Sequence, residues 1–233
     1  DWTLVPSPDI TVENLDDVRT LQMGWERALL SGKNIPLGLE MVAGMVDGDQ
    51  LTLAPQKIVQ PDHVQLNVNV ASEQQTLGQQ FWHIWMAGEG DDDDLVLDAD
   101  DYRMPWVGAP VYDDATRVFA WPQVGEGEWD ATYLNFNWFA ADGKKNPMFG
   151  NVRIVVPPGQ HQFVLPPVPE EYQEWLAPNL DEIEATVMLF DSDQLDWDEA
   201  RQLGVDPSEI PSYGGTITEP ALIRYSSSLN TLD

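Results

Sequence analysis

Alternating apolar and polar residues over positions 129–140 form the clearest pattern in this sequence. Strict alternation is typical of a β-strand that turns one face to a protein core and the other to water or a neighbouring subunit. The apolar face carries large side chains, which predicts that this strand lies at the centre of the core. The predicted inward positions are Thr132, Leu134, Phe136 and Trp138, and the predicted outward positions are Tyr133, Asn135 and Asn137.

Short runs of β-forming residues recur along the chain, separated by Gly, Pro and Asp. The other predicted strands are residues 50–59, 63–70, 80–87, 95–97, 107–112, 117–121, 152–156, 162–165, 185–190 and 216–225. Short strands with turn residues between them favour a sandwich or barrel over alternating β and α units. We therefore expect an all-β fold of about eight to ten strands. The sequence itself shows no internal repeat.

One segment follows a helical period instead of a strand period. Between residues 14 and 30 the apolar residues stand three or four apart, and acidic residues gather at the start. This spacing predicts an N-terminal amphipathic helix that lines the sandwich. Its apolar positions are Leu15, Val18, Leu21, Trp25 and Leu29. We also expect short peripheral helices over residues 170–176 and 193–203, with Ser192 as the N-cap of the second.

The length of 233 residues suits one large β-domain, because all-β folds of this size commonly form a single unit. We expect a single domain over residues 1–233, with an N-terminal arm and helix over 1–49, a sandwich over 50–225 and a C-terminal tail over 226–233. No apolar run reaches the roughly 18 residues that a transmembrane helix needs. Because the sequence opens on Asp1 and not on Met, we expect a processed or trimmed terminus.

Charge changes the picture most. Forty acidic residues against 11 basic ones give a formal charge of −29. The range of this self-repulsion falls from about 8 Å at physiological salt to about 3 Å at molar salt. Since aromatic residues are spread throughout, the composition predicts a folded protein adapted to high salt and not a disordered acidic segment. Lysine and arginine are too sparse to neutralise phosphates, so we expect no direct nucleic-acid binding.

Carboxylates gather most densely between residues 88 and 101, which makes this segment a candidate cation loop. Hard cations prefer oxygen ligands, but the ligand spacing of an EF-hand is missing here. Two interpretations stay open: a specific ion site, and a loop tip that attracts hydrated salt cations nonspecifically. The second is the one we expect. The candidate ligands are Asp91, Asp92, Asp93, Asp94, Asp98 and Asp100.

Other chemistry finds little support in the sequence. Cysteine is absent, which excludes disulfides, thiolate catalysis and cysteine-ligated zinc. His63, His83 and His161 share no metal-ligand spacing, and no nucleotide or hydrolase motif occurs. We therefore expect neither an enzyme nor a cofactor.

Ten tryptophans could supply a sugar-stacking platform, but inward strand positions favour core packing for most of them. The Trp-rich segments 80–87 and 104–112 are also where we expect contacts between subunits. The interface candidates are Trp82, Trp85, Trp106 and Tyr112.

This acidic, lysine-poor, cysteine-free chain of short strands resembles a family of viral proteins. Residues 104–110, Met-Pro-Trp-Val-Gly-Ala-Pro, and the strand over 129–140 are the most suggestive local pieces. The family comprises the small major capsid proteins of icosahedral, internal-membrane viruses of halophilic archaea, and the chain looks like the larger of the two. The resemblance implies a single jelly roll without catalytic residues, located in the virion. It also implies self-association, and pairing with a second, related capsid protein in capsomers over an internal membrane.

Two other function classes stay open. A secreted halophilic carbohydrate-binding β-sandwich or glycoside hydrolase would show an open aromatic cleft, and the hydrolase would add a carboxylate pair. A cell-surface structural protein would show tandem repeats, a threonine-rich stalk or an anchor, and this sequence contains none of these.

Overall fold

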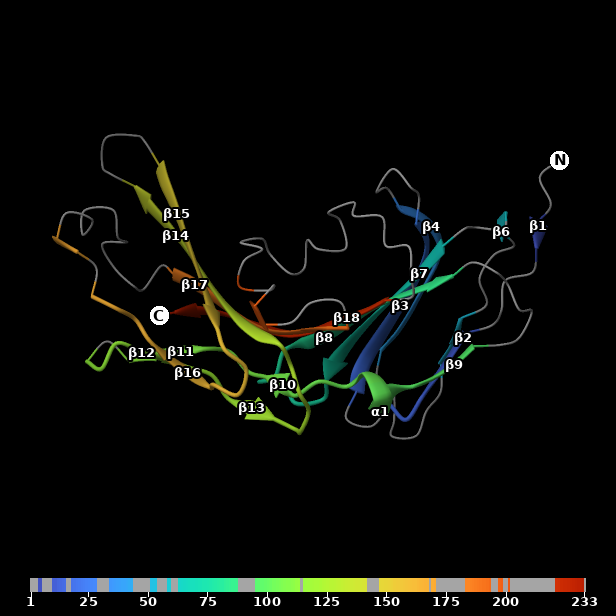
Figure 1. The fold of residues 1–233 in the computed structure, drawn as a ribbon, viewed down its shortest axis with the longest axis horizontal. Coiled ribbons are helices and arrows are strands. Elements are labelled where there is room, and N and C mark those ends of the chain that lie inside the picture. Colours follow the sequence, from blue (N-terminus) through green and yellow to red (C-terminus); the bar gives the residue numbers. More distant parts are fainter. Residues whose placement is uncertain are drawn as a thin grey trace.

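The computed structural model describes the chain in segments, and they are mostly β-strand (Figure 1). The described residues are 4–5, 10–15, 18–28, 34–43, 51–53, 58–59, 63–87, 95–113, 115–141, 147–167, 169–170, 183–193, 197–198, 201 and 221–232. The predicted all-β fold is confirmed. Among these residues, no helix has the length and apolar character needed to cross a membrane.

One antiparallel sheet of eight strands runs through the molecule. Its first half consists of β3 (Val18–Ala28), β4 (Asn34–Ala43), β7 (His63–Ser72) and β8 (Gln79–Ala87). Its second half consists of β14 (Ala131–Ala141), β15 (Pro147–Val156), β17 (Ile183–Ser192) and β18 (Ala221–Leu232). The strand order is β15-β14-β17-β18-β8-β7-β3-β4, so the two halves meet where β8 pairs with β18.

The two halves repeat one connection pattern. In each half, the first strand in sequence (β3 or β14) pairs with the second (β4 or β15), which forms an edge of the sheet. The first strand also pairs with the third (β7 or β17), and the third pairs with the fourth (β8 or β18). The fourth strands, β8 and β18, then pair with each other across seven residue positions, from Ala221 opposite Trp85 to Ser227 opposite Gln79. The structure therefore contains a repeat of topology that the sequence does not display.

Smaller sheets cover both halves of the large sheet. In Figure 1 one of them lies below the second half, at the left, and the other lies beside the first half, at the right. One three-stranded sheet contains β2 (Ile10–Glu13), β5 (Leu51–Leu53) and β9 (Leu95–Asp98), in which β2 and β9 are parallel. The other contains β11 (Val111–Asp113), β12 (Val118–Ala120) and β16 (Gln162–Val164). The remaining elements are β1 (Leu4–Val5) paired with β6 (Ile58–Val59), β10 (Trp106–Val107) paired with β13 (Gln123–Val124), and helix α1 (Ala99–Tyr102).

Each half has its own buried core between the large sheet and its small sheet. The first core gathers side chains from β2, β3, β7, β8 and β9, with Leu21, Leu66 and Trp82 among the most buried. The second gathers side chains from β12, β14, β15 and β17, including Phe119 and Leu134. Burying apolar area in this way, at roughly 25 cal/mol per Å², is what holds each sandwich together.

In strand β14 the predicted alternation is confirmed for Leu134 and Phe136 on one face and for Asn135 and Asn137 on the other. Tyr133 was also predicted to face outward, but it is 3% exposed and packs with Phe190 and Ile223 in a third apolar cluster. Leu134 and Phe136 are buried in the second core, where the Phe136 ring lies 4.2 Å from that of Phe119. On the opposite face, Asn135 and Asn137 are less buried, and each accepts a hydrogen bond of 2.6 Å from the Asn151 side chain on β15. The Trp138 side chain lies outside the described residues.

The predicted N-terminal helix over residues 14–30 is wrong, because residues 18–28 form strand β3. Leu21 and Met23 are fully buried two positions apart, with Gln22 between them facing the other side. Strands β4 and β7 flank β3 and satisfy its backbone hydrogen-bonding groups. The spacing of four between Leu21 and Trp25 fits a strand period as well as a helical one, so these two positions did not distinguish a helix from a strand.

The predicted segment boundaries change accordingly. Residues 34–43 form the edge strand β4, so the expected arm and helix over 1–49 supplies two strands of the large sheet. At the other end, β18 runs to Leu232, so residues 226–232 belong to the sheet and do not form a tail.

Most of the other strand predictions agree with the structure. The segments 63–70, 80–87, 95–97, 117–121, 162–165 and 185–190 match strands to within about two residues. Segment 107–112 instead divides between β10 and β11, and segment 50–59 between β5 and β6. Residues 197, 198 and 201 are helical, within the helix predicted over 193–203, whereas segment 170–176 lies almost wholly outside the described residues.

The single jelly roll is not confirmed by the described strands. A jelly roll is built from two Greek keys distributed over two sheets. Here β3 with β4, β7 with β8, and β14 with β15 pair as sequence neighbours within one large sheet.

Replacing Phe136 with alanine should lower the free energy of unfolding by about 3 to 5 kcal/mol, because the change leaves a cavity against Phe119. The matched substitution Asn137→Ala, on the opposite face, should cost only about 0.5 to 1 kcal/mol, since Asn151 keeps Asn135 as an acceptor. Urea unfolding at constant salt measures both changes. A larger loss for Asn137→Ala than for Phe136→Ala would contradict the register of β14.

Candidate functional site

The structure describes only part of the candidate cation loop. Its described carboxylates, Asp98 and Asp100, lie at the start of helix α1. The Asp98 side chain caps the helix by accepting a hydrogen bond of 3.0 Å from the Asp100 backbone N–H. Hydrogen bonds from the Asn14 side chain and from Asp100 hold the pKa of Asp98 below its usual value. Asp100 lies 3.6 Å from the Arg103 guanidinium. These two acids therefore have local structural roles.

The other four candidate ligands, Asp91, Asp92, Asp93 and Asp94, lie outside the described residues. Within the described segments, His, Asp and Glu side chains form no group of three that could hold a metal ion.

The predicted interface aromatics lie largely inside the subunit. Trp82 and Trp106 face the first core and are 1% and 7% exposed. Tyr112 packs against the second core, with its ring 4.4 Å from that of Phe119. The Trp85 side chain lies outside the described residues. Because β8 and β10 turn Trp82 and Trp106 inward, these side chains leave almost no surface for a partner, and they fit the core role that their strand positions favour.

An exposed apolar surface appears instead on the outer side of the small sheet β11-β12-β16. The inward side of this sheet carries Tyr112, Phe119 and Phe163, which are paired across the three strands. The alternate positions must therefore face outward. The outward residues are Val111, Asp113, Val118, Ala120, Gln162 and Val164, and we name the five uncharged ones the valine face. Val111 is 57% exposed and Val164 is 59% exposed.

Hydrogen bonds at the β11–β12 turn hold in place the strands that carry the valine face. Asp113 accepts hydrogen bonds from the Ala115 backbone N–H at 3.0 Å and from the Thr116 hydroxyl at 2.7 Å. The Thr116 hydrogen bond is the main reason that the pKa of Asp113 is lowered. The Arg117 guanidinium donates to the Pro166 carbonyl, which ties the β11–β12 turn to the segment after β16. Among the described residues of these three strands, Asp113 is the only outward carboxylate, and it lies at the end of the edge strand β11, opposite Val118.

Sequence reasoning missed the valine face because both sides of these strands are apolar. In Val111-Tyr112, Val118-Phe119 and Phe163-Val164, a valine adjoins an aromatic residue, so alternation gives no polar side to place outward. The larger aromatic side chains fill the core, and the valines are left on the surface. The low charge of residues 118–121 and 162–165 was the available signal.

On the opposite, upper face of the large sheet, His83 lies at the junction of the two halves and contacts side chains from both. His83 Nδ1 lies 2.6 Å from the Asn67 side-chain oxygen, and its Nε2 lies 3.3 Å from the Tyr225 hydroxyl. This geometry suits a neutral ring that donates from Nδ1 and accepts at Nε2. Burial lowers the pKa of His83 from 6.5 to about 4, which also favours the neutral form. Phe81 stacks on Tyr225 beside it, with ring centres 4.7 Å apart.

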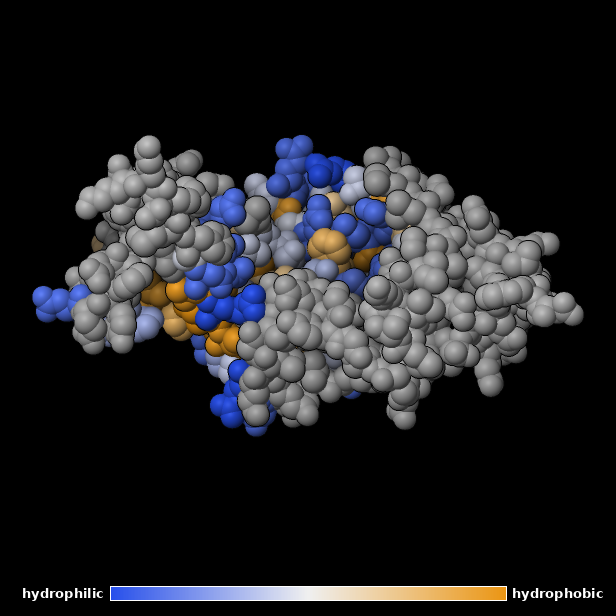
Figure 2. Space-filling view, turned by 90° about the horizontal axis from the view of Figure 1, so that it is seen from above, coloured by the Kyte–Doolittle hydropathy of each residue, from blue (hydrophilic) through white to orange (hydrophobic). Residues whose placement is uncertain are grey.

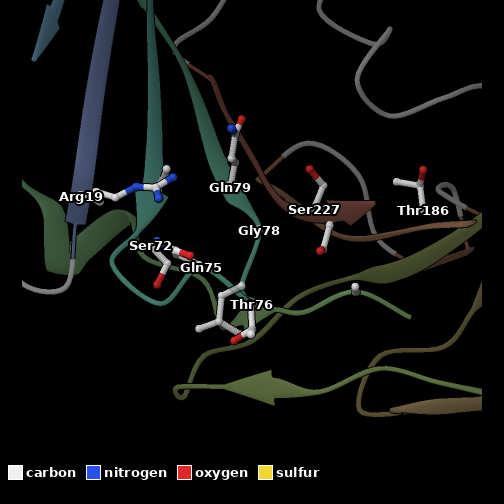
Figure 3. A pocket seen from close by; sticks show the side chains of 12 residues that line it. Arg19, Ser72, Gln75, Thr76, Gly78, Gln79, Thr186 and Ser227 are labelled. Atoms are coloured by element: carbon white, nitrogen blue, oxygen red, sulfur yellow. The ribbon is translucent and has the colours of Figure 1, made fainter. Parts of the chain in front are cut away.

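A polar hollow opens further along the same central strands. It has a volume of about 470 Å³ and is lined by β3, the β7–β8 turn, β17 and β18 (Figure 3). Viewed from above, hydrophilic and apolar residues are interspersed over the described part of this side of the molecule (Figure 2). The hollow is lined by Arg19, Ala71, Ser72, Gln75, Thr76, Leu77, Gly78, Gln79, Ala109, Thr186, Ser227 and Ser228.

Lowering the pH from 6.5 to about 4 should destabilise the wild type relative to His83→Gln by up to about 3 kcal/mol. The sign follows from the lowered pKa: the unfolded chain takes up the His83 proton first, so stability that is present above pH 6.5 is lost as the pH falls. Urea unfolding over this pH range measures the difference, and His161→Gln, a change at an exposed ring, controls for the loss of one histidine. Parallel pH profiles of wild type and His83→Gln would show that His83 is not buried as described.

Comparison with family models, curated proteins and solved structures finds no match to this chain. Its functional assignment therefore rests on the chain's own residues and geometry.

Proposed function

We propose that this chain is a structural subunit of a viral shell, a major capsid protein of the kind found in icosahedral, internal-membrane viruses of halophilic archaea. The valine face is the single observation that supports assembly most strongly, because Val111 and Val164 leave more than half of their surface in solvent. Exposed apolar surface on a folded chain favours contact with another protein. The viral assignment itself rests on the resemblance in length, acidity and strand content.

Charge restricts where two copies can meet. Each copy carries a formal charge of −29 with only 11 basic residues, so complementary charged patches cannot supply the contact. Burying an unpaired carboxylate costs several kcal/mol, which favours uncharged surface at the centre of an interface. The valine face meets this requirement, with Asp113 at its edge. Since stable shell contacts bury about 2,000 Å² or more, the valine face would form the centre of a larger contact.

The proposal includes the partners and place that the resemblance implies. The chain would associate with itself and with a second, related capsid protein, in capsomers over an internal membrane and without direct contact to nucleic acid. The single jelly roll is also part of the proposal and rests on the resemblance alone. The described strands pair as hairpins in one large sheet and do not themselves support it. Molar salt would screen the self-repulsion of such a shell to a range of about 3 Å.

The carbohydrate alternative has less support from the described side chains. Sugar stacking needs aromatic rings open to solvent. Trp82, Trp106 and Trp121 are instead buried in the two cores. We therefore favour assembly over a secreted carbohydrate-binding or hydrolase function.

In molar NaCl the purified chain should form particles of many subunits, and these should dissociate on dilution to about 0.1 M, where screening extends to about 10 Å. Val111→Glu should raise the protein concentration needed for assembly by about tenfold or more, because it places a carboxylate in the contact. Val96→Glu is the matched control, since Val96 is equally exposed at 57% but lies on β9, outside the valine face. Analytical ultracentrifugation measures the masses.

Two outcomes would contradict the proposal. One is a chain that stays monomeric in molar salt at every concentration tested. The other is equal assembly of Val111→Glu and wild type, which would remove the valine face from the contact even if particles form.

A further inference from the structure

We propose that the polar hollow at the junction of the two halves binds an oxyanion, the carboxylate or phosphate group of a small polar molecule. The hollow is built by residues from both halves: Arg19 and the β7–β8 turn on one side, and Thr186, Ser227 and Ser228 on the other (Figure 3). Its volume of about 470 Å³ lies within the usual range of small-molecule sites. This proposal is independent of shell assembly and uses a different surface.

Arg19 is the charged group of the hollow, and it has an unusual position in this chain. Among the arginines whose side chains the structure describes, Arg19 alone has neither a hydrogen bond nor an ion pair. The contacts of four others are Arg103 with Asp100, Arg117 with the Pro166 carbonyl, Arg201 with Asp198, and Arg224 with Asp191, and Arg153 also has a partner. A chain with 40 acidic residues thus leaves this guanidinium available to an external anion.

The composition of the lining favours an anion over a cation. None of the twelve described lining residues is acidic, so the guanidinium of Arg19 is the one charged group among them, and its charge is positive. Five of them carry hydroxyl groups and two carry side-chain amides, and every one of these groups can donate a hydrogen bond. Guanidinium groups bind carboxylates and phosphates through paired, charge-assisted hydrogen bonds. Since these twelve residues include no aromatic ring on which a sugar could stack, an oxyanion fits them better than a neutral sugar.

Ser72 supplies a hydrogen-bond donor whose oxygen is held in place. Its side chain is buried, and its hydroxyl oxygen accepts a hydrogen bond of 3.1 Å from the Gln74 backbone N–H. The hydroxyl proton therefore remains available to a ligand. Because Ser72 is 3% exposed, this donor is shielded from competing water and strengthens the contact.

The frame around the hollow is fixed before a ligand arrives. The β7–β8 turn closes through a hydrogen bond of 2.9 Å from the Leu77 N–H to the Gln74 carbonyl, and the Gly78 N–H donates to the Val107 carbonyl at 2.8 Å. A Cβ at Gly78 would lie 1.7 Å from the Ser227 carbonyl oxygen, so glycine lets β18 approach the turn closely. A preformed frame reduces the entropy that a ligand must lose on binding.

Isothermal titration calorimetry with inorganic phosphate, with succinate and with glucose tests the proposal. All titrations use one NaCl concentration, the lowest at which circular dichroism shows the folded chain, because chloride competes and salt screens the contact. Phosphate, succinate or both should bind, and glucose should not. Binding of only one anion identifies the group that the hollow accepts.

Arg19→Gln should weaken anion binding by about tenfold or more, because it removes the charge and keeps a hydrogen-bonding side chain. Arg19→Lys should retain part of the affinity. Arg201→Gln is the control, since Arg201 is exposed and pairs with Asp198 outside the hollow. Circular dichroism of each variant confirms folding.

Three results would overturn the inference: no binding of either anion, equal affinity in wild type and Arg19→Gln, or glucose binding as tight as that of the anions. Repeating the titration with Val111→Glu separates this site from assembly. That variant should bind the anion as wild type does, whatever its particle mass.

Discussion

The pairing of β8 with β18 is the constraint on which the rest of the described structure depends. These two strands join halves that each have their own core, and they do so through seven opposed residue pairs at the centre of the large sheet. Side-chain contacts support the backbone pairing, since Phe81 stacks on Tyr225 across the junction. The same junction positions His83 and the polar hollow, because both are built from strands of the two halves.

In the described part of the chain, the cores are apolar and most charged residues lie at the surface. The residues of both cores are apolar, whereas described acids such as Asp98, Asp100 and Asp113 lie at helix ends and turns, where hydrogen bonds or an arginine satisfy them. Asp191 is more buried and pairs with Arg224 at 2.7 Å. An acidic chain can fold in this way because its repulsion is confined to the surface, where salt reduces it. Uncharged surface, such as the valine face, then becomes the place where two copies can approach.

The sequence predicted the parts of the fold in which one periodic pattern excludes the others. In β7 and β14, large apolar residues alternate with amides, and the structure confirms both strands. The pattern was ambiguous in β3, because the positions of Leu21 and Trp25 fit a helix and a strand equally well. The pairing of β8 with β18 had no signal at all, since it joins residues more than a hundred positions apart and depends on the whole sheet. The hollow was hidden for the same reason, because Arg19, Ser72, Thr186 and Ser227 come together only in the folded chain.

Hydrogen–deuterium exchange tests the central junction most directly. Backbone amides of residues 79–85 and 223–227 have paired strands on both sides, so in molar salt they should exchange about tenfold or more slowly than those of the edge strands β4 and β15. Peptide-level mass spectrometry would measure this difference. If β8 and β18 instead exchange as fast as β4 and β15, the two halves are not joined through a continuous sheet. The contacts of His83 with both halves, and the hollow that both halves line, would then lose their structural basis.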